Sequence, residues 1–266
     1  MNTLHKLGWL PDVPDLRDVP FRTVYQVPRK LPPRVDLRAG CPPVEDQGEL
    51  GSCTAQALAG ALEFLELAAI RAAPLQPVFH DLSRLFIYYN ERVAMGTVKE
   101  DSGAMLRDGI KTMAKLGACK EDLWPYEIAR FASKPTARCY TEAVGHTVKA
   151  YQRLNSLQEM KSCLAQGLPF VFGFSVYEHV MTPAIARTGV IRLPRSGERM
   201  LGGHAILAVG YDDAKGRLIF RNSWGASWGQ KGYGEMPYDY LTRRELSDDF
   251  WCIQSTASDL YALKKI

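Results

Sequence analysis

One of the six cysteines stands where a helix is expected to begin, which makes it a candidate nucleophile. Cys53 follows Gly51 and Ser52 and precedes a stretch of helical periodicity. Unpaired backbone N–H groups and the helix dipole stabilise an anion at such a position and lower the pKa of a thiol. Alone, Cys53 would more often be a structural residue, because cysteine is among the most buried residue types.

Three further residues supply the other groups that nucleophilic catalysis needs. His204, in GGHAILAVGYDD, opens an apolar strand, and imidazole exchanges a proton readily near neutral pH. Asn222, in RNSWGASWGQKGYG, can orient an imidazole ring, and Gln47, in DQGELGSC, can donate its amide to an oxyanion. Taken alone, each of these three residues is better explained as an ordinary strand, turn or loop residue. Together with Cys53 they supply a nucleophile, a base, a residue that orients the base and an oxyanion donor.

Two tryptophans follow Asn222 in the same glycine-rich stretch. Trp224 is expected to lie over the hydrogen bond between His204 and Asn222, where it would exclude water and strengthen that bond. Trp228 is expected to be an ordinary core residue.

The order Gln, Cys, His, Asn and the motifs around these residues resemble the papain family of cysteine peptidases. The resemblance covers about residues 31–266 and is carried by LPPRVDLR, QGELGSC, GGHAILAVGYD and NSWGASWGQKGYG. It implies an α+β, papain-like two-lobed fold. A helical left lobe (mainly 45–125) and an antiparallel, β-barrel-like right lobe (mainly 140–250) would enclose the active-site cleft.

The resemblance also implies a reaction: hydrolysis of a peptide bond in a peptide or protein substrate, with no cofactor. Cys53 and His204 would form a thiolate–imidazolium pair, which Asn222 orients, and Gln47 would donate to the oxyanion. By the same resemblance, the residues expected to bind substrate are Ser102, Gly103, Ala104, Met105, Gly203, Asp248 and Asp249. Asp248 and Asp249 lie where the family can place a specificity-setting residue; they favour either a basic side chain at the second substrate position or a solvated acidic turn.

Several positions depart from the family pattern. Leu50 stands where the family usually has a cysteine, Thr54 where it has a tryptophan, and EDSGAM (100–105) lacks the family's CNGG-like cysteine. Setting Cys53 aside leaves an odd number of cysteines, so at least one is unpaired, which fits a reducing compartment. These remaining cysteines are Cys41, Cys119, Cys139, Cys163 and Cys252.

Local patterns predict the elements that position these residues. A helix should run from Ser52 to before Pro74, and further helices are predicted at about 81–94, 103–116 and 156–166. Short apolar runs separated by Gly, Pro and Asp predict strands at 170–176, 205–211 and 218–221.

The first 30 residues differ from the rest, because they are rich in proline and show no helical or strand period. They predict an N-terminal arm or short propeptide, with Trp9, Leu10, Phe21 and Tyr25 as apolar anchors. A bacterial branch of the family has a similar short arm. The resulting hypothesis is a zymogen-like regulation in which the arm covers the cleft and inhibits the enzyme.

Composition excludes other classes. The hydrophobic share of 46% and the charged share of 23% are those of ordinary globular proteins. The net charge of +4 is too small to indicate nucleic-acid binding. Apolar stretches are shorter than the ~18–20 residues that span a membrane, and no zinc-ligand spacing is present. Without a Sec-type signal peptide, the chain is expected to be cytoplasmic or exported by a non-classical route.

Two alternatives remain open from the residues. A Cys-His acyl transferase, such as a transglutaminase-like or arylamine acyltransferase enzyme, would use a similar pair, although such enzymes usually complete it with Asp. An inactive papain-like scaffold could also bind peptides without cleaving them.

Overall fold

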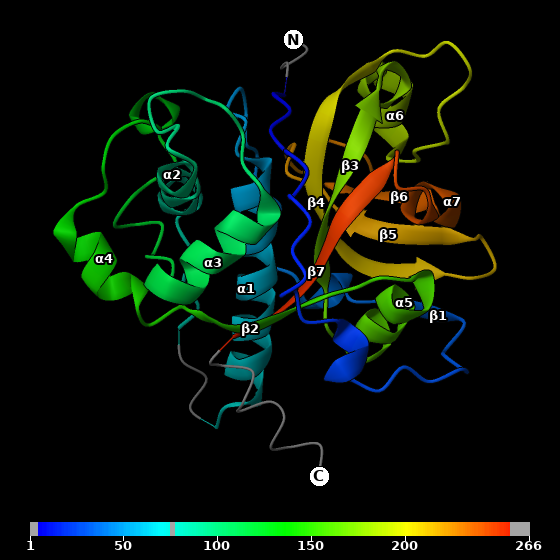
Figure 1. Ribbon diagram of the computed structural model, residues 1–266, viewed down its shortest axis with the longest axis horizontal. Helices are drawn as coiled ribbons and strands as arrows, with labels where there is room; N and C mark the ends of the chain where they lie inside the picture. Colours follow the sequence, from blue (N-terminus) through cyan, green and yellow to red (C-terminus); the bar gives the residue numbers. More distant parts are fainter. Residues whose placement is uncertain (1–4, 75–77, 256–266) are drawn as a thin grey trace.

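Two lobes of different secondary structure make up the protein in the computed structural model (Figure 1). The structure describes residues 5–74 and 78–255; residues 1–4 of the predicted arm and 256–266 of the predicted peptidase domain lie outside the described residues. Helices dominate one lobe and an antiparallel sheet dominates the other, so the predicted α+β, two-lobed fold is confirmed.

The helical lobe is built around one long buried helix. Its elements are α1 (Cys53–Ala72), α2 (Arg84–Met95), α3 (Leu106–Leu116), η3 (Ile128–Arg130) and α4 (Ala137–Ala143). The ends of α2 follow ordinary capping chemistry, because Ser83 accepts a hydrogen bond from the N–H of Phe86 and Gly96 ends the helix in a left-handed conformation.

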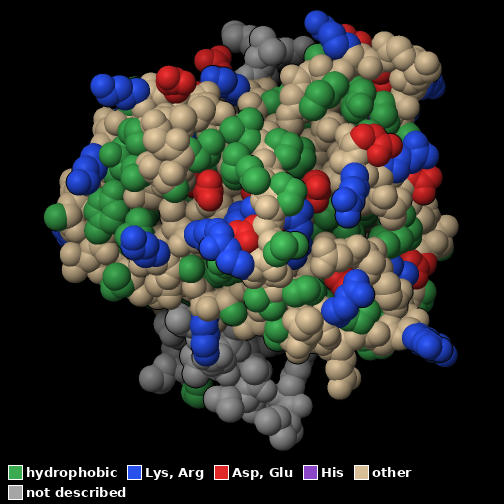
Figure 2. Space-filling view, viewed as in Figure 1, with side chains coloured by type: hydrophobic (Ala, Val, Ile, Leu, Met, Phe, Trp, Pro, Cys, Tyr) green, Lys and Arg blue, Asp and Glu red, His purple; other side chains and the backbone are tan. Residues whose placement is uncertain are grey.

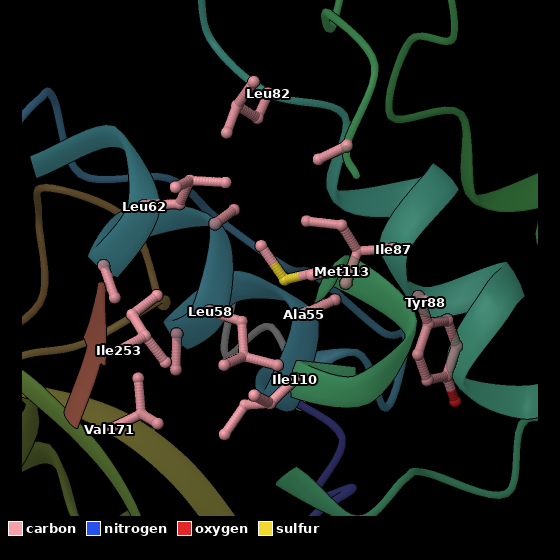
Figure 3. Packing of buried hydrophobic residues seen from close by; sticks show 14 of the residues in the cluster. Ala55, Leu58, Leu62, Leu82, Ile87, Tyr88, Ile110, Met113, Val171 and Ile253 are labelled. Carbon is pink, nitrogen blue, oxygen red and sulfur yellow. The ribbon is translucent and has the colours of Figure 1, made fainter. Parts of the chain in front are cut away.

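Helix α1 joins the two lobes. Figure 3 shows Leu58 of α1 between Ile110 of α3 on one side and Ile253 of the sheet on the other. By length and composition α1 could cross a membrane, but 78% of its apolar window is buried inside the protein, as expected for a core helix. The helix therefore fixes its own first residue, Cys53, at the junction of the lobes.

The described strands form one antiparallel sheet in the order β2-β7-β3-β4-β5-β6, with β1 paired to β4. Their bounds are β1 (Arg34–Asp36), β2 (Val148–Arg153), β3 (Phe170–Tyr177), β4 (Met200–Asp212), β5 (Arg217–Arg221), β6 (Tyr233–Pro237) and β7 (Ser247–Ser255). Helices α5 (Leu157–Ala165), α6 (Pro183–Thr188) and α7 (Tyr238–Thr242) and the short helices η1 (Phe21–Thr23), η2 (Arg38–Gly40) and η4 (Glu178–Met181) complete the described elements. Aromatic side chains of β3 and β7 fill the core of this lobe, with the rings of Phe172 and Phe250 stacked 5.3 Å apart.

Most predicted elements are present, with shifted ends. The predicted helix after Ser52 is confirmed as α1. Helix α3 begins later than predicted, because Gly103 has a left-handed conformation (φ +73°) and Ala104 forms a β-bridge with Trp9 of the arm. Strand β4 begins earlier than predicted, because its glycines still pair with β3. Strands β2, β6 and β7 were not predicted, since their sequences mix polar and apolar residues without clear alternation.

The N-terminal arm runs between the lobes, as the dark blue segment of Figure 1 shows. Its anchors differ in burial: Trp9 is 6% exposed and Phe21 is fully buried, whereas Leu10 and Tyr25 are only partly buried. The rings of Phe21 and Tyr25 stack 4.5 Å apart. The space-filling view shows acidic and basic side chains gathered near the centre of this face, where the arm passes (Figure 2).

Candidate active site

Cys53 and His204 come from elements that pack against each other across the lobe junction. Cys53 is the first residue of α1, and His204 lies in β4, directly opposite Phe174 of β3. Both side chains are completely buried. The backbone N–H of Ala205, which follows His204, is close enough to the Cys53 thiol to act on its pKa. The helix terminus and the sheet register therefore bring the two candidates together.

The imidazole of His204 is held by an amide and an indole. Its Nε2 is 2.8 Å from Oδ1 of Asn222, while its Nδ1 has no hydrogen-bond partner among the described residues. The ring of Trp224 stacks on the imidazole, with the two centroids 4.6 Å apart. Trp228 meets Trp224 edge-on and belongs to the core cluster of the strand-rich lobe. The imidazole of His204 is thus held in place, and its Nδ1 is left without a partner among the described residues.

Gln47 is oriented by its neighbours and points its amide N–H groups toward the arm. Its Nε2 donates to the carbonyl of Lys6 at 2.9 Å and to that of Leu50 at 2.9 Å. Ser223 fixes the other end, because its hydroxyl donates to Oε1 of Gln47 at 2.7 Å. The backbone N–H of Ser223 also donates to Oδ1 of Asn222 at 2.9 Å. One serine, which sequence reasoning missed, therefore holds both amide side chains; its place beside Asn222 was the available signal.

Burial sets the charge state of the pair. Burial raises the pKa of the Cys53 thiol to about 12, against the opposing effect of nearby backbone N–H groups. Burial also lowers the pKa of His204 to about 4, although the hydrogen bond to Asn222 acts in the other direction. With the arm in place, the favoured state at neutral pH is a thiol beside a neutral imidazole. The thiolate–imidazolium pair predicted from the sequence is therefore not favoured in this arm-covered structure.

The first described residues of the arm cover these groups. The ring of His5 stacks on Trp224 with centroids 5.2 Å apart and an interplanar angle of 5°. The ammonium of Lys6 is 2.6 Å from Oδ2 of Asp101, and its carbonyl accepts the Gln47 bond described above. Burial lowers the pKa of His5, which favours its neutral form against the indole. The arm thus lies directly on the Gln47 amide and on the Trp224 ring that stacks on His204.

Backbone pairing continues along the arm. The N–H of Ala104 donates to the carbonyl of Gly8 at 2.8 Å, and the N–H of Leu10 donates to the carbonyl of Ala104 at 3.0 Å. On the opposite wall, the N–H of Trp9 donates to the carbonyl of Gly203 at 3.0 Å. The arm therefore binds both lobes through main-chain hydrogen bonds, as an extended peptide would.

A buried carboxylate receives the next part of the arm. Oδ2 of Asp249 accepts from Nε1 of Trp9 at 3.1 Å and from the backbone N–H of Asp12 at 2.7 Å. Its Oδ1 accepts from Nη2 of Arg153 at 3.0 Å. Burial and the nearby Asp12 carboxyl raise the pKa of Asp249 to about 7.

Two arginines of the body bind the acidic side chains of the arm. Asp12 accepts from the backbone N–H of Arg107 at 3.1 Å and from the indole of Trp251 at 2.9 Å. The guanidinium of Arg107 donates to both carboxylate oxygens of Asp18, and Arg153 lies 3.5 Å from the same carboxylate. The acidic residues of the arm thus have matched partners, which sequence reasoning missed because α3 and β2 lie far away along the chain.

The predicted substrate-binding residues divide into two groups. Those whose described contacts include the arm are Gly103, Ala104, Gly203 and Asp249. The side chain of Ser102 instead bonds within its own loop, to Thr97 at 2.8 Å and to the carbonyl of Gly103 at 3.0 Å, and Met105 is the N-cap residue of α3. Asp248 pairs with Arg153 at 2.7 Å and is 42% exposed.

The six cysteines, all within the described residues, are free thiols. Cys119 contacts Cys139 in the helical lobe, and Cys163 contacts Cys252 in the strand-rich lobe. Among the described residues, no group of three or more His, Cys, Asp or Glu side chains is arranged to hold a metal ion.

The chain belongs to the papain family of cysteine proteases, because the family described as papain family cysteine protease matches residues 31–248. It is a cysteine-type peptidase. The relatives and solved structures that follow agree with this assignment, which leaves no support for the acyl-transferase alternative.

Several known proteins are similar to this chain. The crystal structure of xylellain, a cysteine protease from Xylella fastidiosa, matches with a TM-score of 0.84 and 41% identity, covering 96% of this chain and 97% of that one. An uncharacterised peptidase C1-like protein of Acanthamoeba polyphaga mimivirus is 42% identical over 225 residues, which is 81% of this chain and 70% of the relative. Cathepsin B-like CP3 of Giardia intestinalis is 26% identical over 233 residues, 82% of this chain and 73% of the relative. The chain is therefore xylellain-like within the family.

Proposed function

We propose that this peptidase hydrolyses peptide bonds with Cys53 as nucleophile, and that its N-terminal arm holds it in a latent, zymogen-like state. The arrangement around His204 carries the first part: Nε2 is bound to Asn222 at 2.8 Å, and Nδ1 has no partner among the described residues. With Nε2 occupied, Nδ1 is the nitrogen left to take the proton of the Cys53 thiol.

Catalysis would begin once the arm has left and water has entered the cleft. Solvation and the N-terminus of α1 would then lower the pKa of Cys53, and the proton would pass to His204. The thiolate attacks the substrate carbonyl, and the resulting oxyanion accepts hydrogen bonds from Nε2 of Gln47 and from the backbone N–H of Cys53. Collapse expels the amine, which His204 protonates, and a water molecule activated by His204 hydrolyses the thioester.

The position of Lys6 supports inhibition by the arm. Its carbonyl occupies the Gln47 amide that would serve the oxyanion, so no substrate carbonyl can bind there at the same time. The ring of His5, on the N-terminal side of this carbonyl, stacks on Trp224, so the arm also covers the indole that lies on His204.

Two measurements test the proposed function. Hydrolysis of fluorogenic dipeptide amides should be abolished by Cys53→Ala and kept by Cys41→Ala, which removes a free thiol that is only partly buried. A chain starting at Leu31 should hydrolyse them faster than the full chain. Equal rates and affinities for these two chains would remove the inhibitory role, and absence of hydrolysis by both would favour the peptide-binding scaffold.

A further inference from the structure

The space that the Trp9 ring occupies exists because two residues of the sheet have no side chain. A Cβ added to Gly173 of β3 would lie 1.9 Å from Cε2 of Trp9, and one added to Gly203 of β4 would lie 2.6 Å from Cε3. Both distances are far below van der Waals contact, and the ring atoms cannot move away singly because the indole is rigid. The pair of glycines thus forms a slot as deep as an indole.

This slot lies directly beside the candidate base. Gly203 immediately precedes His204, and Gly173 is the β3 partner of Ala205, the residue that follows it. The N–H of Trp9 donates to the carbonyl of Gly203 at 3.0 Å, so the side chain enters the slot from a main-chain-bonded peptide. Gly203, which bonds to this peptide, is also one of the residues expected to bind substrate, so a substrate side chain would have access to the same slot.

The closed end of the slot carries one hydrogen-bond acceptor. Oδ2 of Asp249 is 3.1 Å from Nε1 of Trp9, and Asp249 is completely buried. The negative charge of this carboxylate is already paired, because its Oδ1 accepts from Arg153 at 3.0 Å. A neutral ring N–H therefore fits the acceptor better than a second cation, which would have to share the carboxylate with Arg153.

The resemblance to the family already implies that Gly203 and Asp249 bind substrate; we propose in addition that the slot formed by Gly173, Gly203 and Asp249 selects an indole side chain there. The proposal rests on the proposed function, since Trp9 must leave before a substrate can enter. From the sequence, Asp248 and Asp249 favoured a basic side chain at the second substrate position or a solvated acidic turn. The proposed slot favours instead a large aromatic ring that carries an N–H donor.

The test uses the full chain with Trp9→Ala, which empties the slot. Fluorogenic dipeptide amides would carry Trp, 1-methyl-Trp, Phe, Leu or Arg at the second position before the cleaved bond. 1-Methyl-Trp keeps the ring but replaces the N–H by N–CH3, so it removes the bond to Asp249 and adds a methyl group beside it; Phe, which lacks the N–H without added bulk, controls for the methyl group. We expect kcat/KM for Trp to exceed that for 1-methyl-Trp and for Phe by about tenfold, the range for a hydrogen bond to a charged group. Equal values for Trp and 1-methyl-Trp, or a preference for Arg, would overturn the proposal.

A second variant tests the shape of the slot. Gly173→Ala in the same background should lower kcat/KM for Trp at least tenfold and leave Leu within about twofold, because the added Cβ occupies only the space of the ring. Gly145→Ala is a matched control, since its Cβ would meet only the carbonyl of Glu142 at 3.5 Å. Equal losses for Trp and Leu would contradict the proposed slot.

If neither chain cleaves any substrate, the proposed function is wrong, but binding to the slot can still be tested. Calorimetry would then compare N-acetyl-tryptophan amide with its 1-methyl analogue on the Trp9→Ala protein. If that variant does not fold, Gly173→Ala in the otherwise native chain replaces it, with tryptophan fluorescence as the measurement. Tighter binding of the N–H form to Trp9→Ala would support the proposal, and equal binding would overturn it. For Gly173→Ala, whose slot is blocked, we expect the indole of Trp9 to be displaced and its fluorescence to change; an unchanged spectrum would contradict the slot.

Discussion

The two stretches of the N-terminal arm differ sharply in how they contact the body. The inner arm, residues 5–12, is bonded to both lobes and buries Trp9 to 6% exposure. The outer arm, residues 13–17, leaves Val13 66% exposed and Leu16 fully exposed, and Pro14, Asp15 and Leu16 line a cavity of about 700 Å³. Each stretch contains one proline, so burial rather than composition separates the segment that covers the candidate site from the outer one, which the Val13 carbonyl bonds to Arg107.

The largest expected effect comes from removing the indole at the centre of the inner arm. Trp9→Ala loses the packing in the glycine slot and the bond to Asp249, for which truncation of a buried aromatic costs about 3–5 kcal/mol. We expect the rate at which iodoacetamide alkylates Cys53 at pH 7 to rise by about 100-fold. Mass spectrometry of the Cys53 peptide measures it. An unchanged rate would mean that the inner arm does not control access.

The same variant should change the dependence of alkylation on pH. In the arm-covered chain the pKa of Cys53 is about 12 and that of His204 about 4, so the pair stays neutral between these values and alkylation should be slow from pH 5 to pH 9. Once the arm loosens, both shifts caused by burial are relieved and a thiolate can form at mildly acidic pH. Trp9→Ala should therefore exceed the native chain by at least tenfold even at pH 5.5. Parallel profiles with a constant small offset would argue against this account.

A smaller effect is expected at the end of the inner arm. Both oxygens of the Asp12 carboxylate accept N–H groups, one from Arg107 and one from Trp251. Asp12→Asn turns one acceptor into a donor that faces a donor, which costs about 1–3 kcal/mol, so alkylation of Cys53 should rise about tenfold. Asp15→Asn is the control, because Asp15 pairs with Arg17 inside the outer arm and should leave the rate unchanged.

The smallest effect should come from the surface ion pair. The side chain of Lys6 is 48% exposed and pairs with Asp101 at 2.6 Å, and such pairs contribute less than about 1 kcal/mol. Lys6→Ala should raise the alkylation rate two- to threefold in low salt and less in high salt. Leu16→Ala, in the fully exposed part of the outer arm, should give no change at any salt concentration. A larger effect at Leu16 than at Lys6 would reverse the comparison between the two stretches.

Sequence patterns predict correctly those elements whose signals lie in neighbouring residues. The apolar period after Ser52 predicts α1, and the glycines before His204 mark a position where another backbone comes close. Long-range partners have no such signal: nothing near Asp12 in the sequence indicates that Arg107 of α3 and Trp251 of β7 will bind it.

Neighbouring residues also have roles that sequence cannot separate. Asp248 and Asp249 are chemically identical, yet one is partly exposed and the other reaches the buried Trp9 ring. Backbone geometry accompanies the difference, because Asp249 has φ +58°, a left-handed conformation, at the point where β7 shifts register against β3. Aspartate tolerates this conformation better than most residues, but the sequence does not show which of the two adopts it.

The complete burial of Cys53 has a consequence for how this protein would be detected. Electrophilic probes that report cysteine peptidases in cell extracts depend on an accessible, ionised sulfur. A protein whose own amino-terminal segment encloses that sulfur would escape such labelling while being abundant, and would enter the labelled fraction only after the segment is displaced. Labelling intensity would therefore record how much of the population has opened, not how much protein is there.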